Sequence, residues 1–330
     1  MVYCNCDDPR ISNFFHYFSY SFSHLGLRKL ITTCYKNQQM DMFSKHDQER
    51  AVMQRYDGLR ECDAVPKAED IGITCLQGDG DFRSPECVEF LKQSDIVVTN
   101  PPFSLFREYV AQLMEHDRKF IIIGNKNAIT YREIFPLIQQ NKIWAGHTPM
   151  GKDLLFDLPE DFAAELLACK KDGSSYRIVD GVVKGRSQSI WYTNLSHSKR
   201  HEELYLSERH DPQSYPKYDN HDAINVDEIR NIPRDWKGVM GVPITFLDKY
   251  NPDQFEILGI TKTWFGAATK TYPSQVQISA NGKRSEVSKL NDGAALRIMG
   301  PIDKTYYVVE GNYYKQAYAR ILIRNRNPEK

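Results

Sequence analysis

The sequence predicts an α/β protein with a doubly wound, mostly parallel sheet in its first half and a mixed or β-rich extension in its second. In the first half, short apolar runs alternate with longer amphipathic stretches. This alternation is typical of parallel strands joined by helices that cover both faces of a sheet. After about residue 165, short β-like runs are separated by segments rich in Pro, Gly, Asn and Asp, which is typical of strands joined by turns.

The first half supplies the elements of such a sheet in order. Runs with the composition of short strands stand at residues 2–6, 29–35, 71–76, 95–99 and 120–124. Apolar or aromatic residues at helical spacing predict helices within 11–25, 85–93 and 105–116, with the aromatic residues of the first helix packing in the core. Because parallel sheets bind their ligands at the carboxyl ends of the strands, the residues that follow each strand are the candidate site.

The second half contains β-like runs at residues 187–194, 255–260, 294–299, 306–310 and 318–324. We therefore expect two domains, at 1–165 and 166–330. The chain carries 43 basic and 43 acidic residues, so a uniformly basic nucleic-acid coat is excluded. Local patches remain, since residues 170–200 hold seven basic and two acidic side chains, and residues 251–330 hold 12 and 7. A polyanion is expected to dock in the second half.

No run approaches the roughly 18 to 20 apolar residues that cross a bilayer, and the first residues do not resemble a secretion signal. Seven cysteines form an odd set that is too sparse for a disulfide framework. We therefore expect a cytoplasmic protein without a membrane partner. Cys4 and Cys6 lack a second metal-binding pair, so we expect them in a buried strand and expect no metal site.

The segment 95–106, DIVVTNPPFSLF, is the most informative part of the sequence. Pro101 and Pro102 have no backbone N–H and stop strand pairing, which leaves a rigid loop at the end of the strand. Asn100 offers a side-chain carbonyl, and Pro101 offers a backbone carbonyl. Two neutral acceptors suit a planar amino group on a conjugated ring, because they return the nitrogen lone pair to nucleophilic use. Phe103 can stack on that ring. The two acceptors together indicate an amide or a nucleobase amino group as substrate.

Simpler interpretations stand beside this one. Asn-Pro-Pro is also an ordinary turn after a strand. The segment Asp7-Asp8-Pro9 is also a possible helix N-cap with a proline in the first turn. Asp79 and Asp81 also suit a solvated turn.

Three segments together resemble the DNA adenine-N6 methyltransferases that use S-adenosylmethionine, and the EcoRI-type modification methylases most closely. These segments are VYCNCDDP at 2–9, GDGDFRS at 78–84 and VVTNPPFSLF at 97–106. The family signature is Asp, Asn or Ser, followed by two prolines and an aromatic residue. Similar segments at 120–138 and 238–259 extend the resemblance over nearly the whole chain. It implies a Rossmann-like sheet at 1–165 that binds the cofactor and a target-recognition region at 166–330.

The resemblance also implies roles for single residues in the reaction. Asn100 and Pro101 would accept the hydrogens of the target amino group, Pro102 would hold the loop, and Phe103 would stack on an adenine flipped out of the duplex. The cofactor-binding set would be Asn5, Asp7, Asp8, Pro9, Cys34, Gly78, Asp79, Gly80, Asp81 and Phe82. Within it, Asp7 or Asp8 would pair with the ammonium of the cofactor, and Asp81 and Phe82 would hold its adenine.

Three features depart from the family pattern. The first strand lacks the Gly-rich turn of most methyltransferases, although the EcoRI-type group shares this lack. The second predicted strand ends without the acidic residue that commonly holds ribose hydroxyls. Family members also have a segment upstream of the first strand, with an EFYT-like motif over the cofactor, whereas here Met1 directly precedes that strand. We expect a truncation, a start assigned too late, or another segment that covers the cofactor.

Recognition of double-stranded DNA is expected to fall to the second half. The candidates for phosphate contacts are Lys184, Arg186, Lys199, Arg200, Arg324 and Arg326. Each of them also suits an ordinary solvated surface. A restriction endonuclease acting on the same site is the further partner that the resemblance implies. The alternatives are a methyltransferase for another planar nitrogen, in RNA or in a protein glutamine, and a DNA-binding relative with impaired catalysis.

Overall fold

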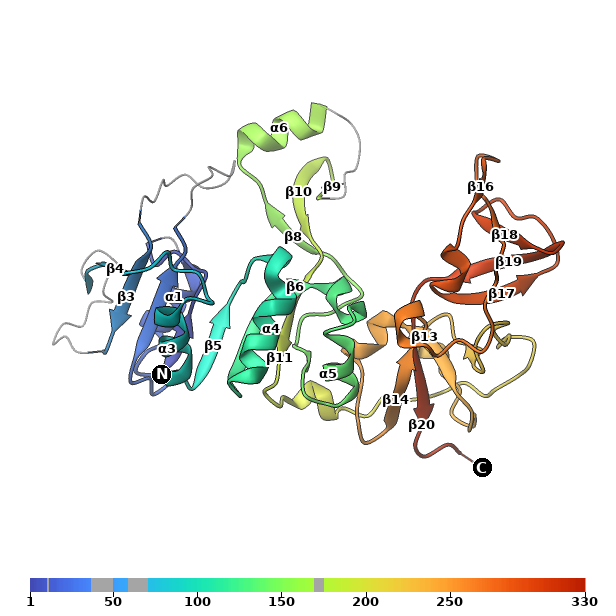
Figure 1. The fold of residues 1–330 in the computed structure, drawn as a ribbon, viewed down its shortest axis with the longest axis horizontal. Coiled ribbons are helices and arrows are strands. Elements are labelled where there is room, and N and C mark those ends of the chain that lie inside the picture. Colours follow the sequence, from blue (N-terminus) through green and yellow to red (C-terminus); the bar gives the residue numbers. More distant parts are fainter. Residues whose placement is uncertain (11, 37–49, 59–70, 169–174, 330) are drawn as a thin grey trace. The chain divides into compact units, whose positions relative to one another are not determined.

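The structure is a computed structural model that describes residues 1–10, 12–36, 50–58, 71–168 and 175–329. These residues form two compact units (Figure 1). The first unit comprises Met1–Lys126, Ile143–Thr148 and Lys152–Leu195, and the second comprises Asn127–Lys142, Pro149–Gly151 and Ser196–Lys330. The predicted domains, 1–165 and 166–330, were defined by function. They stay a prediction, because the two compact units describe only how the chain packs.

The main sheet of the first unit has the strand order β4-β3-β2-β1-β5-β6-β11-β7. Its strands are β1 (Val2–Cys4), β2 (Leu30–Cys34), β3 (Val52–Tyr56), β4 (Thr74–Cys75), β5 (Ile96–Thr99), β6 (Lys119–Asn125), β7 (Trp144–Ala145) and β11 (Ser189–Thr193). The central strands β2, β1, β5 and β6 are parallel, as predicted. The flanking strands pair antiparallel, so the sheet as a whole is mixed.

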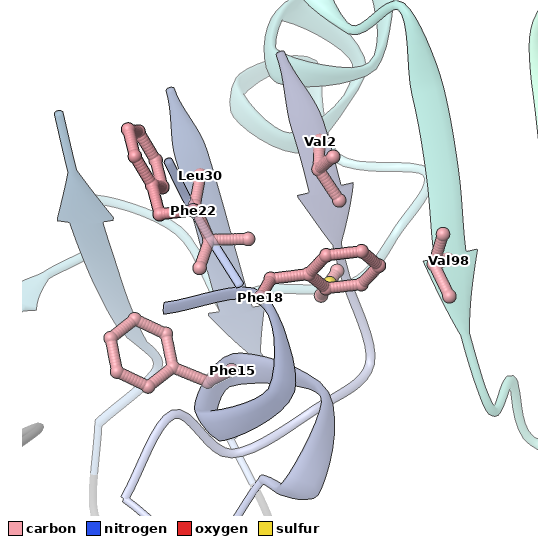
Figure 2. Packing of buried hydrophobic residues seen from close by; sticks show 7 residues of the cluster. Val2, Phe15, Phe18, Phe22, Leu30 and Val98 are labelled. Carbon is pink, nitrogen blue, oxygen red and sulfur yellow. The ribbon is translucent and has the colours of Figure 1, made fainter. Parts of the chain in front are cut away.

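Successive residues of a strand point to opposite faces of a sheet, and in β1 both Val2 and Tyr3 are buried. Helices cover both faces. On one face, Phe15, Phe18 and Phe22 pack against Val2 and Leu30, as Figure 2 shows. They come from α1 (Asn13–Tyr20) and the turn after it. On the other face, the ring of Tyr3 from β1 meets Phe90 with ring centroids 6.1 Å apart. Phe90 belongs to α3 (Pro85–Gln93), and α4 (Phe106–Glu115) follows β5. The aromatic run of α1 is only partly core, since Tyr17 and Tyr20 are exposed.

The ends of two helices follow from their sequences. The Ser84 side chain accepts a hydrogen bond from the Cys87 N–H, and Pro85 occupies the first turn of α3, where its missing N–H costs nothing. Ser12 caps α1 in the same way by accepting from the Phe15 N–H. Asp7, Asp8 and Pro9 therefore precede the cap of α1 and do not form it.

The first unit also contains a small separate sheet with the strand order β8-β10-β9. Its elements are β8 (Leu154–Asp157), α6 (Glu160–Ala168), β9 (Tyr176–Val179) and β10 (Val182–Ser187), and we call the described residues 154–168 and 175–187 the arm (Figure 1). The predicted strand at 187–194 is divided between these sheets, because β10 ends at Ser187 and β11 pairs with β6 of the main sheet. The strands β3 and β7 and the arm were not predicted from the sequence.

The second unit is built mainly from two sheets, with the orders β12-β13-β20-β14 and β16-β15-β18-β19-β17. Their strands are β12 (Ile224–Asn225), β13 (Met240–Pro243), β14 (Phe255–Ile260), β15 (Val276–Ile278), β16 (Arg284–Glu286), β17 (Ala294–Ile298), β18 (Tyr306–Val309), β19 (Asn312–Ala317) and β20 (Arg320–Asn325). The helix α5 (Phe135–Gln139) also belongs here, as do the 3-10 helices η3 (Ser198–His201), η4 (Ile229–Asn231), η5 (Ile244–Asp248), η6 (Thr263–Phe265) and η7 (Lys289–Asn291). Four of the runs predicted in this half therefore form strands.

Candidate active site

The predicted catalytic loop leaves the sheet at the end of β5. Asn100 follows the buried Thr99 directly, and its side chain is exposed. Pro101 is buried and Pro102 is exposed, so the first proline fixes the loop against the core. The Leu105 N–H donates to the Pro102 carbonyl over 3.0 Å. This bond closes the short 3-10 helix η1 (Phe103–Leu105), which leads directly into α4.

Asn100 and Phe103 line one cavity of about 350 Å³ within the first unit. Phe103 is 45% exposed and is therefore available to a ligand. The remaining lining residues are Ile123, Leu154, Ser187, Ser189, Ile190 and Trp191. The structure thus brings together an amide, two aromatic rings and several apolar side chains at the carboxyl end of β5.

Trp191 lies in the run 187–194 that was predicted as a strand, but its place in this cavity was not predicted. Trp191 stands opposite Ile123 in the antiparallel pair of β11 and β6, which brings it to the wall beside the catalytic loop. The run SQSIWYTN reads as a strand, but a strand pattern does not say which sheet the strand joins. Leu154 gives no sequence signal of this position.

The end of β1 is tied to the catalytic strand and to the helix after it. The side-chain carbonyl of Asn5 accepts from the Tyr109 hydroxyl of α4, and the Asn5 backbone carbonyl accepts from the Thr99 hydroxyl at the end of β5. Asn5 is 1% exposed. Its side chain therefore acts within the protein, where it fixes the position of residues 5–9 relative to the catalytic loop.

Asp7 and Asp8 differ in their partners. Asp8 holds Arg10, whose guanidinium lies 2.8 Å from its carboxylate. Asp7 accepts from the Ser12 hydroxyl and, among the described residues, makes no ion pair. Burial raises the pKa of Asp7 to about 6, because a desolvated carboxylate resists ionisation without a cation beside it. Pro9 is buried next to these two acids. Asp7 is therefore the acid of this segment that a bound ammonium would stabilise most.

The loop 78–82 lies against the end of β2. Gly80 has a φ of +75°, and a Cβ there would lie 2.3 Å from the Cys34 carbonyl oxygen, so the approach requires glycine. The Asp79 carbonyl accepts from the Lys36 N–H over 2.8 Å. Gly78 donates its N–H to the Glu86 carboxylate over 3.3 Å. Of the predicted cofactor residues in this loop, Gly80 therefore lies directly against Cys34, and Asp79 is bonded to Lys36, two residues beyond it.

Cys34 itself is not a nucleophile in this setting. Its thiol donates to the Tyr35 carbonyl over 3.3 Å. Burial raises the pKa of Cys34 to about 12, so the thiol stays protonated at neutral pH. Among the described residues, no group of three or more His, Cys, Asp or Glu side chains is placed to hold a metal ion. In the same described ranges, no helix has the length and apolar character to cross a membrane.

Asp81 and Phe82 are more enclosed than the sequence suggests. Arg83 contacts both carboxylate oxygens of Asp81, at 2.9 and 2.8 Å, and these hydrogen bonds lower the pKa of Asp81. Phe82 is 3% exposed, and its ring meets Tyr109 edge-on with centroids 5.1 Å apart. The segment predicted to hold the cofactor adenine is therefore rigid, and the assigned role of each side chain stays a prediction.

Most of the predicted phosphate-binding residues already have protein partners. In the arm, Lys184 pairs with Asp157, and Arg186 pairs with Asp153. In the second unit, Lys199 pairs with Asp248, and the Arg200 guanidinium donates to Asn141 over 2.8 Å.

The last two candidates differ in their surroundings. Arg324 lies 3.7 Å from Glu256 and is 47% exposed at its side chain. Arg326 donates to the Pro252 carbonyl over 2.9 Å. Two of the seven basic residues counted at 170–200, Lys170 and Lys171, lie outside the described residues, as do two of the seven cysteines, Cys62 and Cys169. Among the candidates that pair with an acid, Arg324 has the most exposed side chain and the longest ion-pair distance.

Comparison with known proteins identifies the family. The model of the family described as adenine-specific methyltransferase EcoRI matches residues 1–326. The Type II methyltransferase M.EcoRI of Escherichia coli is 46% identical over 265 residues, which cover 79% of each chain. The Type II methyltransferase M.MgeORF184P of Mycoplasma genitalium is 38% identical over 268 residues, or 78% of this chain and 74% of that one.

A third relative, the Type II methyltransferase M.MpnI of Mycoplasma pneumoniae, is 36% identical over 264 residues, with the same shares covered. No solved structure matches the chain. The matches confirm the family resemblance that was expected from the three sequence segments. The chain therefore belongs to the EcoRI family of adenine-specific methyltransferases and is a DNA adenine methyltransferase.

Proposed function

We propose that this enzyme transfers the methyl group of S-adenosylmethionine to N6 of an adenine that is flipped out of double-stranded DNA at a specific site. The cavity beside the catalytic loop carries this proposal. It is lined by Asn100, Phe103 and Trp191, and its volume of about 350 Å³ falls in the usual range of small-ligand pockets. An amide and two aromatic rings around one cavity suit a planar base that carries an amino group.

The catalytic loop would act without a titrating base. The side-chain carbonyl of Asn100 and the backbone carbonyl of Pro101 would each accept one hydrogen of the N6 amino group. Acceptors that are held in place before the reaction favour the pyramidal nitrogen of the transition state over the planar nitrogen of the free base. Phe103 would fix the plane of the adenine by stacking. The proton would leave after transfer, so neither acceptor needs a shifted pKa.

The described residues suit the cofactor at the ends of β1 and β2. When bound, S-adenosylmethionine supplies an electrophilic methyl group on a sulfonium. Asp7 is a buried carboxylate with a raised pKa and, among the described residues, no cation beside it, which suits the ammonium of a methionine moiety. The close approach of Gly80 to Cys34 brings the loop 78–82 to the end of β2, where it would hold the adenosine part.

The task of each part of the chain is also proposed. The parallel strands β2, β1, β5 and β6 suit a Rossmann-like catalytic domain at 1–165, with the cofactor at their carboxyl ends. The region 166–330 would recognise the DNA target, which its basic balance between residues 251 and 330 supports. The enzyme would act in the cytoplasm, with a restriction endonuclease of the same specificity as partner.

The test is an incubation of the purified chain with duplex DNA and S-adenosylmethionine labelled in its methyl group. The DNA is then digested to nucleosides and separated. Label in N6-methyladenine supports the proposal, and label in another nucleoside overturns it. Label that appears in added RNA or in protein glutamine, or DNA binding without any label, assigns the chain to one of the alternative functions.

A further inference from the structure

The arm has one largely apolar face and one face that mixes charged and apolar residues. In the antiparallel pair of β8 and β10, Phe156 stands opposite Gly185, and Leu154 stands opposite Ser187. Directly opposed residues of such a pair point to the same side, so these four share one face with the buried Val183. The other face is mixed, since it carries the charged residues Asp157, Arg177, Lys184 and Arg186 together with the exposed apolar residues Leu155, Val179 and Val182.

Phe156 has a fixed position on the apolar face. A Cβ at Gly185 would lie 2.3 Å from Cε2 of the Phe156 ring, so the ring covers the bare backbone of the opposite strand. A glycine in a strand interior often marks such a close approach. The Phe156 side chain nevertheless remains 50% exposed, although α6 contacts β10. The arm therefore presents a pre-oriented aromatic ring to solvent.

This apolar face continues into the catalytic pocket. Leu154 lines the cavity together with Asn100 and Phe103, and it is itself 42% exposed. Phe156 lies two residues further on the same face, or about 6.6 Å along the strand. An apolar surface thus runs from the mouth of the pocket to Phe156.

We infer that the arm contacts the DNA next to the target adenine and that Phe156 stacks on a base beside the vacated position. This inference rests on the proposed function. Flipping an adenine out of the duplex leaves the faces of its neighbouring bases without a stacking partner, and this loss opposes flipping. Apolar side chains that insert at base steps replace part of the lost stacking. A half-exposed ring held beside the pocket supplies such a side chain.

Duplex DNA suits this surface better than a second copy of the chain. The apolar surface that contains Leu154 and Phe156 ends at Phe103 and Asn100, which line the pocket. A second copy seated there would cover the entrance to the pocket that the substrate must enter. The DNA substrate, in contrast, reaches this surface whenever its adenine is in the pocket.

The test compares two short duplexes after the methylated site has been located by sequencing a plasmid treated with the wild-type chain. In one duplex the target adenine is paired with thymine, and in the other it stands opposite an abasic position, where flipping costs less. We expect Phe156→Ala to lower kcat/KM by about 10- to 100-fold on the paired duplex, in line with the stacking of one base. On the abasic duplex, we expect the loss to shrink to about 3-fold or less.

Val182→Ala is the matched control, because Val182 is an apolar residue that is 53% exposed on the opposite face of the arm from Phe156. We expect it to retain wild-type rates on both duplexes. Gly185→Ala is a second variant in case Phe156→Ala destabilises the arm. It displaces the ring without removing it, and we expect the same selective loss on the paired duplex.

Three results overturn the inference: equal losses on both duplexes, no loss on either, or a wild-type dimer that Phe156→Ala converts to monomers with no selective loss. If the wild-type chain transfers no label to adenine, the proposed function itself is overturned. This experiment is done first, before any variant is made, so the two failures are distinguished.

Discussion

The hydroxyl of Tyr109 donates to the side-chain carbonyl of Asn5, and both residues are buried. The bond joins the helix after the catalytic loop to the end of the first strand. Tyr109→Phe would leave the Asn5 carbonyl buried without its donor, which costs about 1 to 3 kcal/mol in the free energy of unfolding. We also expect weaker cofactor binding, because residues 5–9 lose a fixed anchor. Urea unfolding and calorimetric titration with S-adenosylmethionine measure the two effects.

Tyr307→Phe is the control for this change. Tyr307 is a buried tyrosine of the second unit whose hydroxyl donates to Gln316, so the substitution removes a comparable hydrogen bond elsewhere. We expect it to leave cofactor binding unchanged. Unaltered unfolding and binding in Tyr109→Phe would show that the bond does not hold the two elements together.

Asn100→Ala is expected to lower methyl transfer by at least about 100-fold, because one of two fixed acceptors is lost from the transition state. The side chain is exposed and follows a complete strand, so the fold and the cofactor affinity are expected to stay near wild type. Asn100→Asp keeps an acceptor oxygen and should retain more activity than Asn100→Ala. Single-turnover rates and cofactor titration separate these effects, and a fully active Asn100→Ala would refute the acceptor role.

Phe103→Ala removes a half-exposed ring from the pocket without opening the core. Base stacking on an aromatic side chain is worth about 1 to 3 kcal/mol, so kcat/KM should fall by about 5- to 150-fold. Phe103→Tyr keeps the ring and should stay close to wild type. If both variants lower kcat/KM equally, stacking of the Phe103 ring is not what this residue contributes to the reaction.

The pH dependence of folding follows from Asp7. Burial raises its pKa from 3.8 to about 6, so between these pH values the folded chain binds a proton more tightly than the unfolded chain. The contribution of Asp7 to stability is therefore complete below about pH 3.8 and is lost as the pH rises through about 6. The full shift corresponds to about 3 kcal/mol. Asp7→Asn should raise the free energy of unfolding at pH 8, as measured by urea titration.

Cofactor binding should depend on pH in the opposite direction. Ionised Asp7 gains a cation when an ammonium binds, so wild-type affinity should rise from pH 5 to pH 7, and Asp7→Asn should bind weakly with a flatter pH profile. Asp8→Asn is the control, because Asp8 already pairs with Arg10. An identical pH profile in wild type and Asp7→Asn would assign the ammonium to another group.

The basic candidates are expected to separate into structural and DNA-binding residues. The side chains of Lys199 and Asp248 are 13% and 10% exposed, so Lys199→Ala leaves an acid largely buried without this partner. For a buried pair this costs about 3 to 5 kcal/mol. The salt dependence of DNA binding should stay unchanged. Arg324→Ala should show the reverse, with little change in unfolding and a salt slope smaller by about 1.

Local patterns predicted much of the first unit. The parallel strands and the range of α3 follow from apolar runs and from caps such as Ser84, which act between neighbours in sequence. The loop at residues 100–103 could be proposed as catalytic for the same reason, since all the chemistry predicted for it lies within four consecutive residues. The antiparallel flank was not found, because pairing of β11 with β6 joins residues far apart in the chain. The position of Trp191 in the wall of the pocket was for this reason not predicted.

The basic residues show a second limit. Sequence counts find Lys184, Arg186 and Lys199, but each has an acid as partner. Net charge over a segment does not reveal such pairs, because the partner comes from another strand or loop. The count therefore overstates how many cations are available to phosphate.

The arm passes directly into the wall of the pocket. β10 ends at Ser187 and β11 begins at Ser189, and the Ser187 and Ser189 hydroxyls are 2.8 Å apart across this junction. The backbone carbonyl of the intervening Gln188 accepts from the Lys126 N–H over 2.8 Å. Only Gln188 separates the two strands, and both hydrogen bonds fix this junction, so the arm and the strand that carries Trp191 share one short, bonded connection. A molecule that binds the arm is therefore expected to disturb the wall of the pocket as well as the proposed contact between Phe156 and the DNA.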